Sequence, residues 1–282
     1  MRLDRRDLTR GLIGSLVAGL CLPAEAQTLE QAFLKDLEAL AQDPAVIGLG
    51  ASPRERLTRL PGDPLGAQAS FWSRASTTAI SDLARQLIVT FEVSGQSEYQ
   101  RRYQRPIWPK GQSGVTIGIG YDLGYNDQAK FAGDWGHLID ASSFEKLKPA
   151  LGVRGAAAEP LARGLQEVVI SWTPALKQFD SFLPFAIGKT EDTFPNASGL
   201  PGHSLGALVS LVYNRGPSLS PTSSRRREMR QIYTLMKELR FKEIPQKIRD
   251  MKRIWADDPN LRGLVIRREK EAQLFELGFK AS

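Results

Sequence analysis

Apolar residues recur every three or four positions along much of the chain, which is the spacing of one face of an α-helix. This pattern predicts a helix over residues 28–41, a second that begins after Ser81 and ends before Gly95, and further helices from about residue 159 onward. Prolines and capping residues indicate where the later helices begin: Pro160, Pro174, Ser224, Pro245 and Asp258. A strand is expected at residues 115–119, and a loop or short hairpin at residues 96–113. The predicted fold class is therefore α+β and mostly helical.

Breaker residues divide the chain into parts. Residues 42–75 are rich in proline and glycine, which predicts an irregular arm rather than a regular element. We expect a signal peptide at residues 1–26, an N-terminal helix and irregular arm at residues 27–77, and the main domain at residues 78–282.

The predicted signal peptide has the features of an export signal. Arginines precede an apolar run at residues 11–22, and residues 24–26 (Ala-Glu-Ala) have the small-x-small form of a signal-peptidase site. The arginine pair at residues 5–6 is typical of a twin-arginine signal. We expect cleavage before Gln27, with no stable membrane insertion afterwards and a periplasmic or secreted product. The alternative interpretation is an uncleaved N-terminal membrane anchor.

Charge and cysteine usage narrow the classes of partner. The chain carries a formal net charge of +7, and a basic protein favours a polyanionic partner. Nucleic acid and the anionic bacterial wall both fit this charge, and export favours the wall over nucleic acid. The one cysteine, Cys21, lies in the signal peptide, so the exported chain is expected to hold no disulfide.

The most informative stretch is residues 114–125, which read GVTIGIGYDLGY. It places Thr116 and Asp122 among closely spaced glycines, and Glu92 lies upstream at the end of a predicted helix. Glycoside hydrolysis needs one protonated carboxyl group and one ionised carboxylate. Glu92, between apolar neighbours, suits the acid because desolvation raises a carboxyl pKa. Asp122, in an expected wetter turn, suits the base, and the Thr116 hydroxyl would hold the attacking water.

Strand geometry sets a condition on this interpretation. Thr116 and Asp122 would lie roughly 20 Å apart in a straight strand, which is too far for both to share one water. Both can act only if the chain folds back, which Gly118, Gly120 and Gly124 permit because glycine accepts a positive φ. The competing interpretation is that the two carboxylates are a surface helix end and an ordinary turn residue.

At these residues the chain resembles the phage-type lysozymes, glycoside hydrolase family 24. TIGIG follows a glutamate on a helix and a tyrosine-rich loop, as in that family. The stretch between Glu92 and Thr116 holds no aspartate, which departs from the phage pattern. Thr116 and Asp122 instead have the Thr-x5-Asp spacing of the variant seen in the bacteriocin pesticin and its relatives. The resemblance covers about residues 78–280. It implies a lysozyme-like, two-lobed fold with a small β-region and a helical lobe, no cofactor, and an inverting mechanism.

The resemblance also implies substrate-binding positions. Residues 207–216 (ALVSLVYNRG) resemble the helix that crosses between the two lobes, and residues 263–275 (GLVIRREKEAQLF) resemble the closing helix. The expected saccharide contacts on these segments are Asn214, Arg215, Arg267 and Arg268. Further expected contacts nearer the glycine-rich stretch are Tyr121, Tyr125 and Trp108, with burial as the commoner role of an aromatic such as Trp108.

A second motif points to another class of enzyme. Residues 202–206 read GHSLG, the form of a lipase nucleophile elbow, which should follow an apolar strand and precede a helix. The preceding residues are not strand-like, and no histidine follows Ser204, because the two histidines are His137 and His203. We therefore expect Ser204 to cap a helix, with a serine lipase or esterase as the disfavoured alternative.

The remaining signals are weaker. Two histidines and no cysteine after the signal peptide argue against a catalytic zinc site, so no metal is expected. The arginines of residues 223–227 fit either a solvated helix start against an anionic wall or a nucleic-acid patch. The sequence thus predicts a monomeric peptidoglycan hydrolase, an N-acetylmuramidase that cleaves β-1,4-glycosidic bonds by general acid/base catalysis. A non-catalytic wall-binding module is the alternative.

Overall fold

The structure of the chain is a computed structural model, which describes residues 24–49 and 74–280. Most of the predicted signal peptide and most of the predicted irregular arm lie outside the described residues, so the export prediction stays a prediction. Residues 24–26 form the start of the first helix.

Helices account for most of the described chain. They are α1 (Ala24–Leu40), α3 (Asp82–Val93), α4 (Gln96–Arg102), α5 (Gln128–Trp135), α6 (Ala141–Leu147), α7 (Ala158–Gly164), α8 (Trp172–Thr193), α9 (Gly202–Arg215), α10 (Arg227–Lys237), α11 (Ile244–Asp250) and α12 (Arg262–Lys280). Two short strands, β1 (Thr116–Ile117) and β2 (Tyr121–Asp122), form a hairpin. The prediction of a mostly helical α+β class is confirmed.

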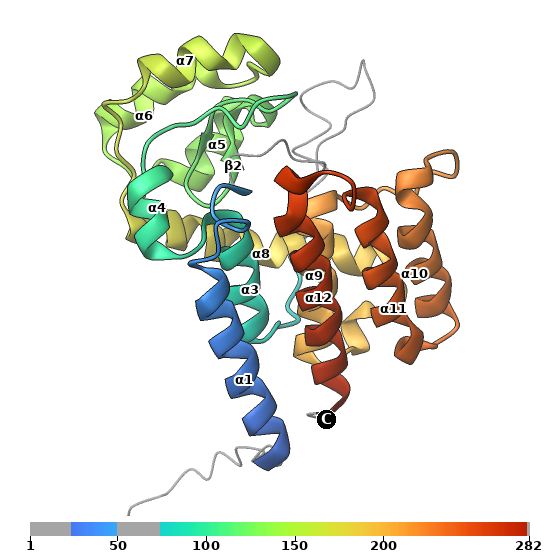
Figure 1. The fold of residues 1–282 in the computed structure, drawn as a ribbon. Coiled ribbons are helices and arrows are strands. Elements are labelled where there is room, and N and C mark those ends of the chain that lie inside the picture. The colour runs from blue at the N-terminus through green and yellow to red at the C-terminus, as the bar shows by residue number, and fades with distance from the viewer. Residues whose placement is uncertain (1–23, 50–73, 281–282) are drawn as a thin grey trace, which may run out of the picture.

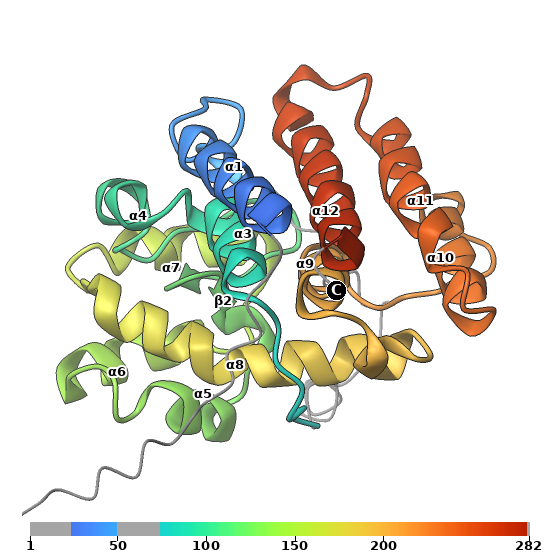
Figure 2. The ribbon, with the colours of Figure 1, turned by 90° about the horizontal axis from the view of Figure 1, so that it is seen from below.

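The elements form two groups joined by α8. Helices α4 to α7 and the hairpin lie on one side of the molecule, and α9 to α12 lie on the other (Figure 1). Helix α8 runs along both groups and contacts α4 and α5 at one side and α9 at the other (Figure 2). The expectation that residues 207–216 form the crossing helix is therefore wrong for this chain, because α9 packs within the second group against α12, α3 and α8.

Helix α3 forms as its sequence predicts. The Ser81 hydroxyl accepts a hydrogen bond from the Ala84 amide and caps the first turn. The helix ends where Ser94 adopts the left-handed conformation at φ 58°, immediately before Gly95. The apolar face of the helix is buried, and Glu92 lies buried in its last turn.

The predicted strand at residues 115–119 folds back on itself. Thr116 pairs with Asp122 and Ile117 with Tyr121 in an antiparallel register. The reversal occurs at Gly118 and Gly120, whose φ values are 57° and 84°. A side chain at Gly118 would also meet the Trp135 indole at 2.8 Å. Glycine therefore makes this tight reversal possible, as the sequence condition required.

The structure differs from the sequence prediction at α4, which was expected to be a loop or hairpin, and at α5 and α6, which were not expected. Residues 96–113 contain helix α4, which is too short and polar for a clear apolar period and is fixed by tertiary contacts instead. Its Tyr99 is buried, lies edge-on to Trp172 and donates a hydrogen bond to the Ile170 carbonyl at 2.8 Å. Helices α5 and α6 were not predicted, although the side chains of Asp127 and Asp140 cap them.

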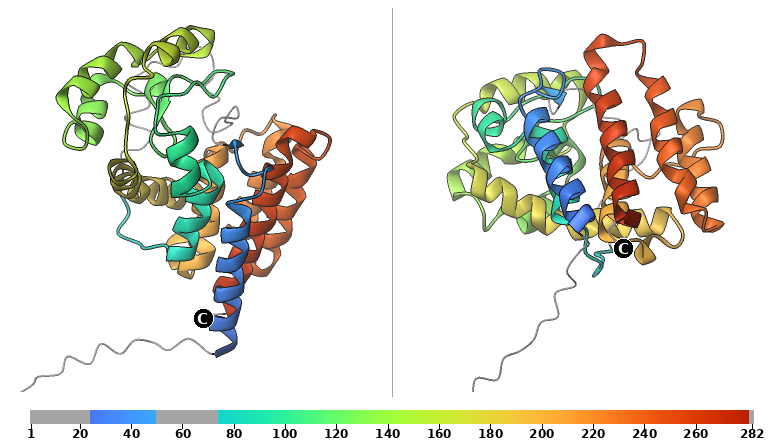
Figure 3. Two further views of the ribbon diagram at one scale, coloured as in Figure 1. Left: turned by 60° about the vertical axis from the view of Figure 1, so that its left-hand side comes forward. Right: turned by 60° about the horizontal axis from the view of Figure 1, so that its bottom comes forward.

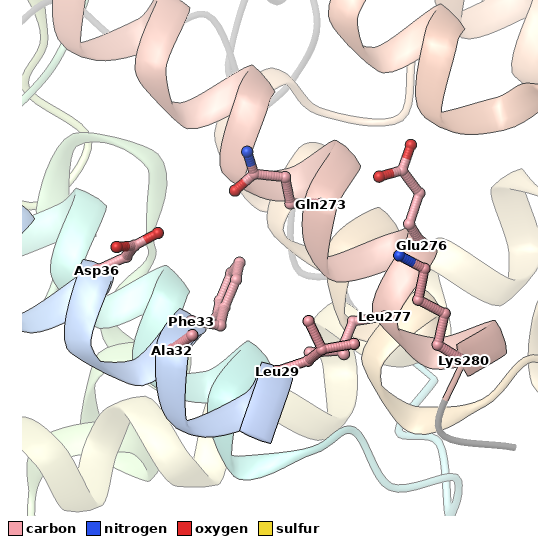
Figure 4. A pocket seen from close by; sticks show the side chains of 8 residues that line it. All are labelled: Leu29, Ala32, Phe33, Asp36, Gln273, Glu276, Leu277 and Lys280. Atoms are coloured by element: carbon pink, nitrogen blue, oxygen red, sulfur yellow. The ribbon is translucent and has the colours of Figure 1, made fainter. Parts of the chain in front are cut away.

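The described N-terminal residues pack on the main domain. Helix α1 lies beside α3 and α12 (Figure 3), with Phe33 and Leu37 buried. The Ala45 carbonyl approaches α12 so closely that a side chain at Gly263 would come within 2.1 Å of it. A shallow groove remains between α1 and the C-terminal part of α12, with Phe33 and Leu277 in its walls (Figure 4). No helix of the described residues is long and apolar enough to cross a bilayer.

Candidate functional site

Glu92 lies in a buried ion pair that joins α3 to α12. Its side chain is 3% exposed, and its Oε1 accepts a hydrogen bond at 3.0 Å from Nη1 of Arg267, a residue 175 positions away on α12. The Arg267 guanidinium lies over the Phe91 ring, 5.7 Å from its centroid. The predicted burial of Glu92 is confirmed, but an arginine next to it stabilises the ionised form, which sequence reasoning did not consider.

Arg267 also donates hydrogen bonds to residues other than Glu92. Its Nε donates to Glu271 Oε1 at 3.1 Å, and its Nη2 donates to the Ser210 hydroxyl at 3.0 Å and to the Ser210 carbonyl at 3.1 Å. Glu271 also accepts from the Ser210 hydroxyl at 2.7 Å and from Arg268 at 3.0 Å. All of these side chains are buried. Glu92 therefore belongs to a network that includes α9 and α12.

Asp122 is held by backbone amides. Its carboxylate accepts from Gly114 N–H at 3.0 and 3.1 Å, one distance to each oxygen, and from Gly124 N–H at 2.9 Å. Both glycines are needed, because a side chain at Gly114 would meet the Asp122 carboxylate at 2.6 Å and one at Gly124 would meet the Val153 carbonyl at 2.5 Å. The expectation of a wetter turn is wrong: Asp122 is 7% exposed. Backbone donors favour its ionised form.

Thr116 lies directly opposite Asp122 in the hairpin register. Opposed residues of an antiparallel pair project from the same face, with Cβ atoms about 5 Å apart. The Thr116 hydroxyl makes only a long contact, 3.5 Å, with the Gly114 carbonyl. This register places a hydroxyl and a carboxylate next to each other on one face of the hairpin.

One face of α9 links the hairpin to the Glu92 network. The Tyr213 hydroxyl donates to the Ile119 carbonyl in the hairpin turn at 3.0 Å. Ser210, three residues earlier, binds Arg267, and Asn214 accepts from Arg268 at 3.1 Å. Side chains three and four positions apart are neighbours on a helix. Helix α9 therefore positions the hairpin and the partners of Glu92 from a single surface.

Three predicted saccharide contacts have packing roles in this structure. Tyr121 is buried and lies edge-on to Trp135, with ring centroids 5.6 Å apart, and burial together with nearby Asp134 raises its pKa. The Tyr125 hydroxyl donates to the Gln112 carbonyl at 2.9 Å. The Trp108 indole N–H donates to the Ser113 carbonyl at 3.0 Å, although this ring is only partly buried. These bonds fix the loop before β1.

The predicted contacts on α9 and α12 form a second buried cluster. Arg215 and Arg268 lie over the Trp255 ring, with guanidinium carbons 5.0 and 5.5 Å from its centroid. Burial lowers the pKa of Arg215 to about 10 and that of Arg268 to about 9. Because both side chains are 0% exposed, neither is available to a saccharide in this structure. Asn214, which is half-buried, stays the more accessible of the α9 positions.

The GHSLG motif lacks the geometry of a nucleophile elbow. Ser204 lies inside α9 rather than at its N-cap, so the capping prediction is wrong, and its buried hydroxyl donates to the Phe275 carbonyl at 2.7 Å. His203 instead contacts the Ser81 hydroxyl at 2.6 Å and Glu30 at 2.8 Å. A short 3-10 helix precedes the motif, not a strand. The Ser204 hydroxyl therefore joins α9 to α12 through a buried hydrogen bond.

Two further sequence features are the arginine-rich stretch at residues 223–227 and the small number of histidine and cysteine side chains. Arg226, in the arginine-rich stretch, is buried rather than solvated, and burial with help from Arg215 lowers its pKa to about 10. Within residues 24–49 and 74–280, no group of three or more His, Cys, Asp or Glu side chains is arranged to hold a metal ion.

Comparison with known proteins adds one match. A family model described as a domain of unknown function (DUF8812) matches residues 87–181. The match begins inside α3 and ends inside α8, so it contains Glu92, Thr116 and Asp122 but neither α9 nor α12. No curated protein matches the chain. The matched segment thus holds the three predicted catalytic residues without the side chains that bind Glu92.

Sequence reasoning missed Ser210, Tyr213 and Glu271. Ser210 and Tyr213 are polar positions three apart on an otherwise apolar helix, a pattern that indicates buried hydrogen bonds. Glu271 precedes Leu274 and Phe275 by three and four residues, so it shares their inward face. A carboxylate on that face signals a buried ionic partner.

Proposed function

We propose that this chain is a peptidoglycan hydrolase, an N-acetylmuramidase, in which Glu92 is the general acid, Asp122 the general base, and Thr116 the residue that holds the attacking water. We propose with it a lysozyme-like, two-lobed arrangement and action in the periplasm or outside the cell. The observation that carries the proposal is the hairpin register, which sets Thr116 opposite Asp122.

The geometry suits the chemistry of an inverting glycosidase. Such an enzyme needs an ionised carboxylate that activates a water on one face of the sugar ring and a protonated acid on the other. Asp122 has the backbone donors that keep a carboxylate ionised, and Thr116 lies directly opposite it in the hairpin. The carboxyl groups of Glu92 and Asp122 are predicted to lie about 6.5–9.5 Å apart across the substrate.

The proposed reaction requires two changes from the state seen in the structure. Glu92 must bind a proton despite its arginine partner, and the substrate must reach side chains that are only 3%, 4% and 7% exposed for Glu92, Thr116 and Asp122. Catalysis therefore requires the site to open when a glycan strand binds. Loops and domains that move during substrate binding are common in enzymes, and the closed state then excludes water from the reaction.

The decisive experiment identifies the bond that is cleaved. The exported chain is incubated with purified sacculi, and the soluble fragments are identified by mass spectrometry together with an assay for new reducing ends. An N-acetylmuramidase releases fragments that end in reducing N-acetylmuramic acid. A non-catalytic wall-binding module would sediment with the sacculi and release no reducing ends.

A matched pair of variants tests the role of Glu92. Glu92→Gln should lower the rate of fragment release by at least about 100-fold while the protein stays folded, because general acid catalysis contributes about 10²–10⁴-fold. Glu98→Gln is the control, since Glu98 is the other acidic residue before Thr116 and is equally buried, at 1% exposed. It pairs with Arg101 and Arg102 and should leave the rate unchanged. Retained activity in Glu92→Gln would remove Glu92 as the acid.

A further inference from the structure

The contact between Glu92 and Arg267 conflicts with the role of an acid. A guanidinium 3.0 Å from a buried carboxylate favours the ionised form, whereas a general acid must carry a proton near the working pH. The conflict is resolved if something else in the structure draws the positive charge of Arg267 away from Glu92.

Glu271 is placed to do this. Arg267 divides its donors: Nη1 goes to Glu92, Nε goes to Glu271 at 3.1 Å, and Nη2 goes to Ser210. Glu271 is 0% exposed, and its Oε1 is fixed by the Ser210 hydroxyl at 2.7 Å. A second carboxylate therefore shares the same guanidinium on its opposite side.

We propose, on the basis of the proposed function, that Glu271 is a positioning residue that competes with Glu92 for Arg267 and thereby allows Glu92 to hold the proton that the reaction needs. Glu271 touches no reacting atom and acts through Arg267. The substrate class is unchanged; what the inference adds is the group that sets the charge state of the acid.

The charges around this pair support the direction of the effect. Removal of the Glu271 charge takes away a carboxylate that repels an ionised Glu92, and it also leaves Arg267 free to pair with Glu92 alone. Both changes favour ionised Glu92. The other charged groups that act on Glu271 are Arg268, which donates to it at 3.0 Å, and Arg215 on α9.

The test is a direct titration of Glu92. The chain is labelled with ¹³C at glutamate carboxyl carbons, the Glu92 signal is assigned from its loss in Glu92→Gln, and its midpoint is followed by NMR. Glu271→Gln should lower this midpoint by about one pH unit, a change of roughly 1.4 kcal/mol between the two protonation states. An unchanged midpoint in folded Glu271→Gln would overturn the inference.

Glu228→Gln is the matched control for this titration. Glu228 is also a fully buried carboxylate between arginines in the same group of helices, but its partners are Arg253 and Arg227, not Arg267. The substitution should destabilise the protein without moving the Glu92 midpoint. A shift as large as that of Glu271→Gln would show that any buried charge change in this region has the same effect, and would overturn the specific role of Glu271.

A second variant keeps the test decisive if Glu271→Gln does not fold. Glu271→Gln combined with Arg268→Met removes an ion pair as a unit and leaves no extra buried charge. Because Arg268 donates to Glu271 rather than to Glu92, the midpoint should still fall. A midpoint that stays at the wild-type value in the folded double variant would also overturn the proposal.

Kinetics separate this inference from the proposed function. In Glu271→Gln the alkaline limb of the pH–rate profile should move to lower pH by the same amount as the midpoint, with kcat reduced at neutral pH and KM little changed. If the wild-type chain releases no wall fragments yet the midpoint moves, the proposed function fails and the coupling stands. If wild-type hydrolysis occurs and the midpoint does not move, the coupling alone fails.

Discussion

The two carboxylates of the candidate site are held in opposite ways. Asp122 is bound by the backbone amides of Gly114 and Gly124, eight and two residues away. Glu92 is bound by the side chain of Arg267, 175 residues away. Backbone donors belong to the fold of the hairpin and cannot be redirected, whereas a guanidinium can be shared among several acceptors.

This difference fits the roles in the proposed reaction. A carboxylate that backbone amides hold in its ionised form can accept the proton of the attacking water, and a carboxylate whose cationic partner is shared can carry the proton of the acid. Substitutions at Arg267 and at Gly114 test the two modes of binding separately.

The largest effect is expected at Arg267. Arg267→Met leaves the carboxylates of Glu92 and Glu271 buried without their shared cation, which should lower the free energy of unfolding by about 3–5 kcal/mol. Urea unfolding followed by circular dichroism measures this loss. The control is Arg240→Met, because Arg240 is 54% exposed and pairs only with surface carboxylates, so it should change stability little.

Neutralising Glu92 should restore part of that stability. Adding Glu92→Gln to Arg267→Met removes the buried carboxylate charge that Arg267 balanced, while Glu271 keeps its ion pair with Arg268, so the double variant should be more stable than the single one. A double variant that is less stable than Arg267→Met would show that the network contributes packing rather than charge balance.

The backbone side of the comparison is tested at Gly114. A methyl group there would come within 2.5 Å of the Gly124 backbone and 2.6 Å of the Asp122 carboxylate, so Gly114→Ala should cost about 2–3 kcal/mol. Gly133→Ala is the control, because no atom lies within 4 Å of the added methyl and the residue lies inside α5. It should stabilise the protein by about 0.5–1 kcal/mol. Equal unfolding midpoints for Gly114→Ala and wild type would show that close packing of Gly114 against Asp122 and Gly124 does not stabilise the protein.

A smaller loss of stability is expected from the contact between α9 and the hairpin. Tyr213→Phe removes the hydrogen bond to the buried Ile119 carbonyl and should cost about 1–2 kcal/mol. Tyr233→Phe, at an exposed tyrosine on α10, should stay within about 0.5 kcal/mol of wild type. Hydrogen exchange at residues 116–122 should increase in the first variant only. Protection that is unchanged in Tyr213→Phe would mean that α9 does not support the hairpin.

The smallest effect is a pH dependence of stability at Glu228. Burial alone would raise the pKa of Glu228, but hydrogen bonds from Arg253 and Arg227 hold it below the usual value of 4.5. A depressed folded-state pKa contributes stability that is present above pH 4.5 and is lost as the pH falls further. Urea unfolding at pH 7 and pH 3.5 should show a gap between wild type and Glu228→Gln that narrows at the lower pH. A constant gap would exclude this contribution.

Much of the fold follows from local signals. The position of Glu92 in the last turn of α3 comes from the Ser81 cap and from the apolar stripe of the helix, both written within a dozen residues. Thr116 and Asp122 can act together only if the chain reverses between them. The structure has this reversal at Gly118 and Gly120, and it places β1 and β2 in register. Helix α4 escaped prediction because Tyr99 and its distant partner Trp172 fix it, not an apolar period.

Three things could be predicted from the sequence: the helical character of the chain, the helix boundaries at proline, serine and glycine, and Glu92, Thr116 and Asp122 as candidates for acid/base chemistry. They depend on local periodicity and backbone preference, which a short window of residues contains. Three other features depend on tertiary packing: the hydrogen bonds from backbone amides to Asp122, the hydrogen bond from Ser204 to the Phe275 carbonyl, and the sharing of Arg267 between Glu92 and Glu271. Those contacts join side chains that are far apart in sequence, and their geometry exists only after α9 and α12 have packed together.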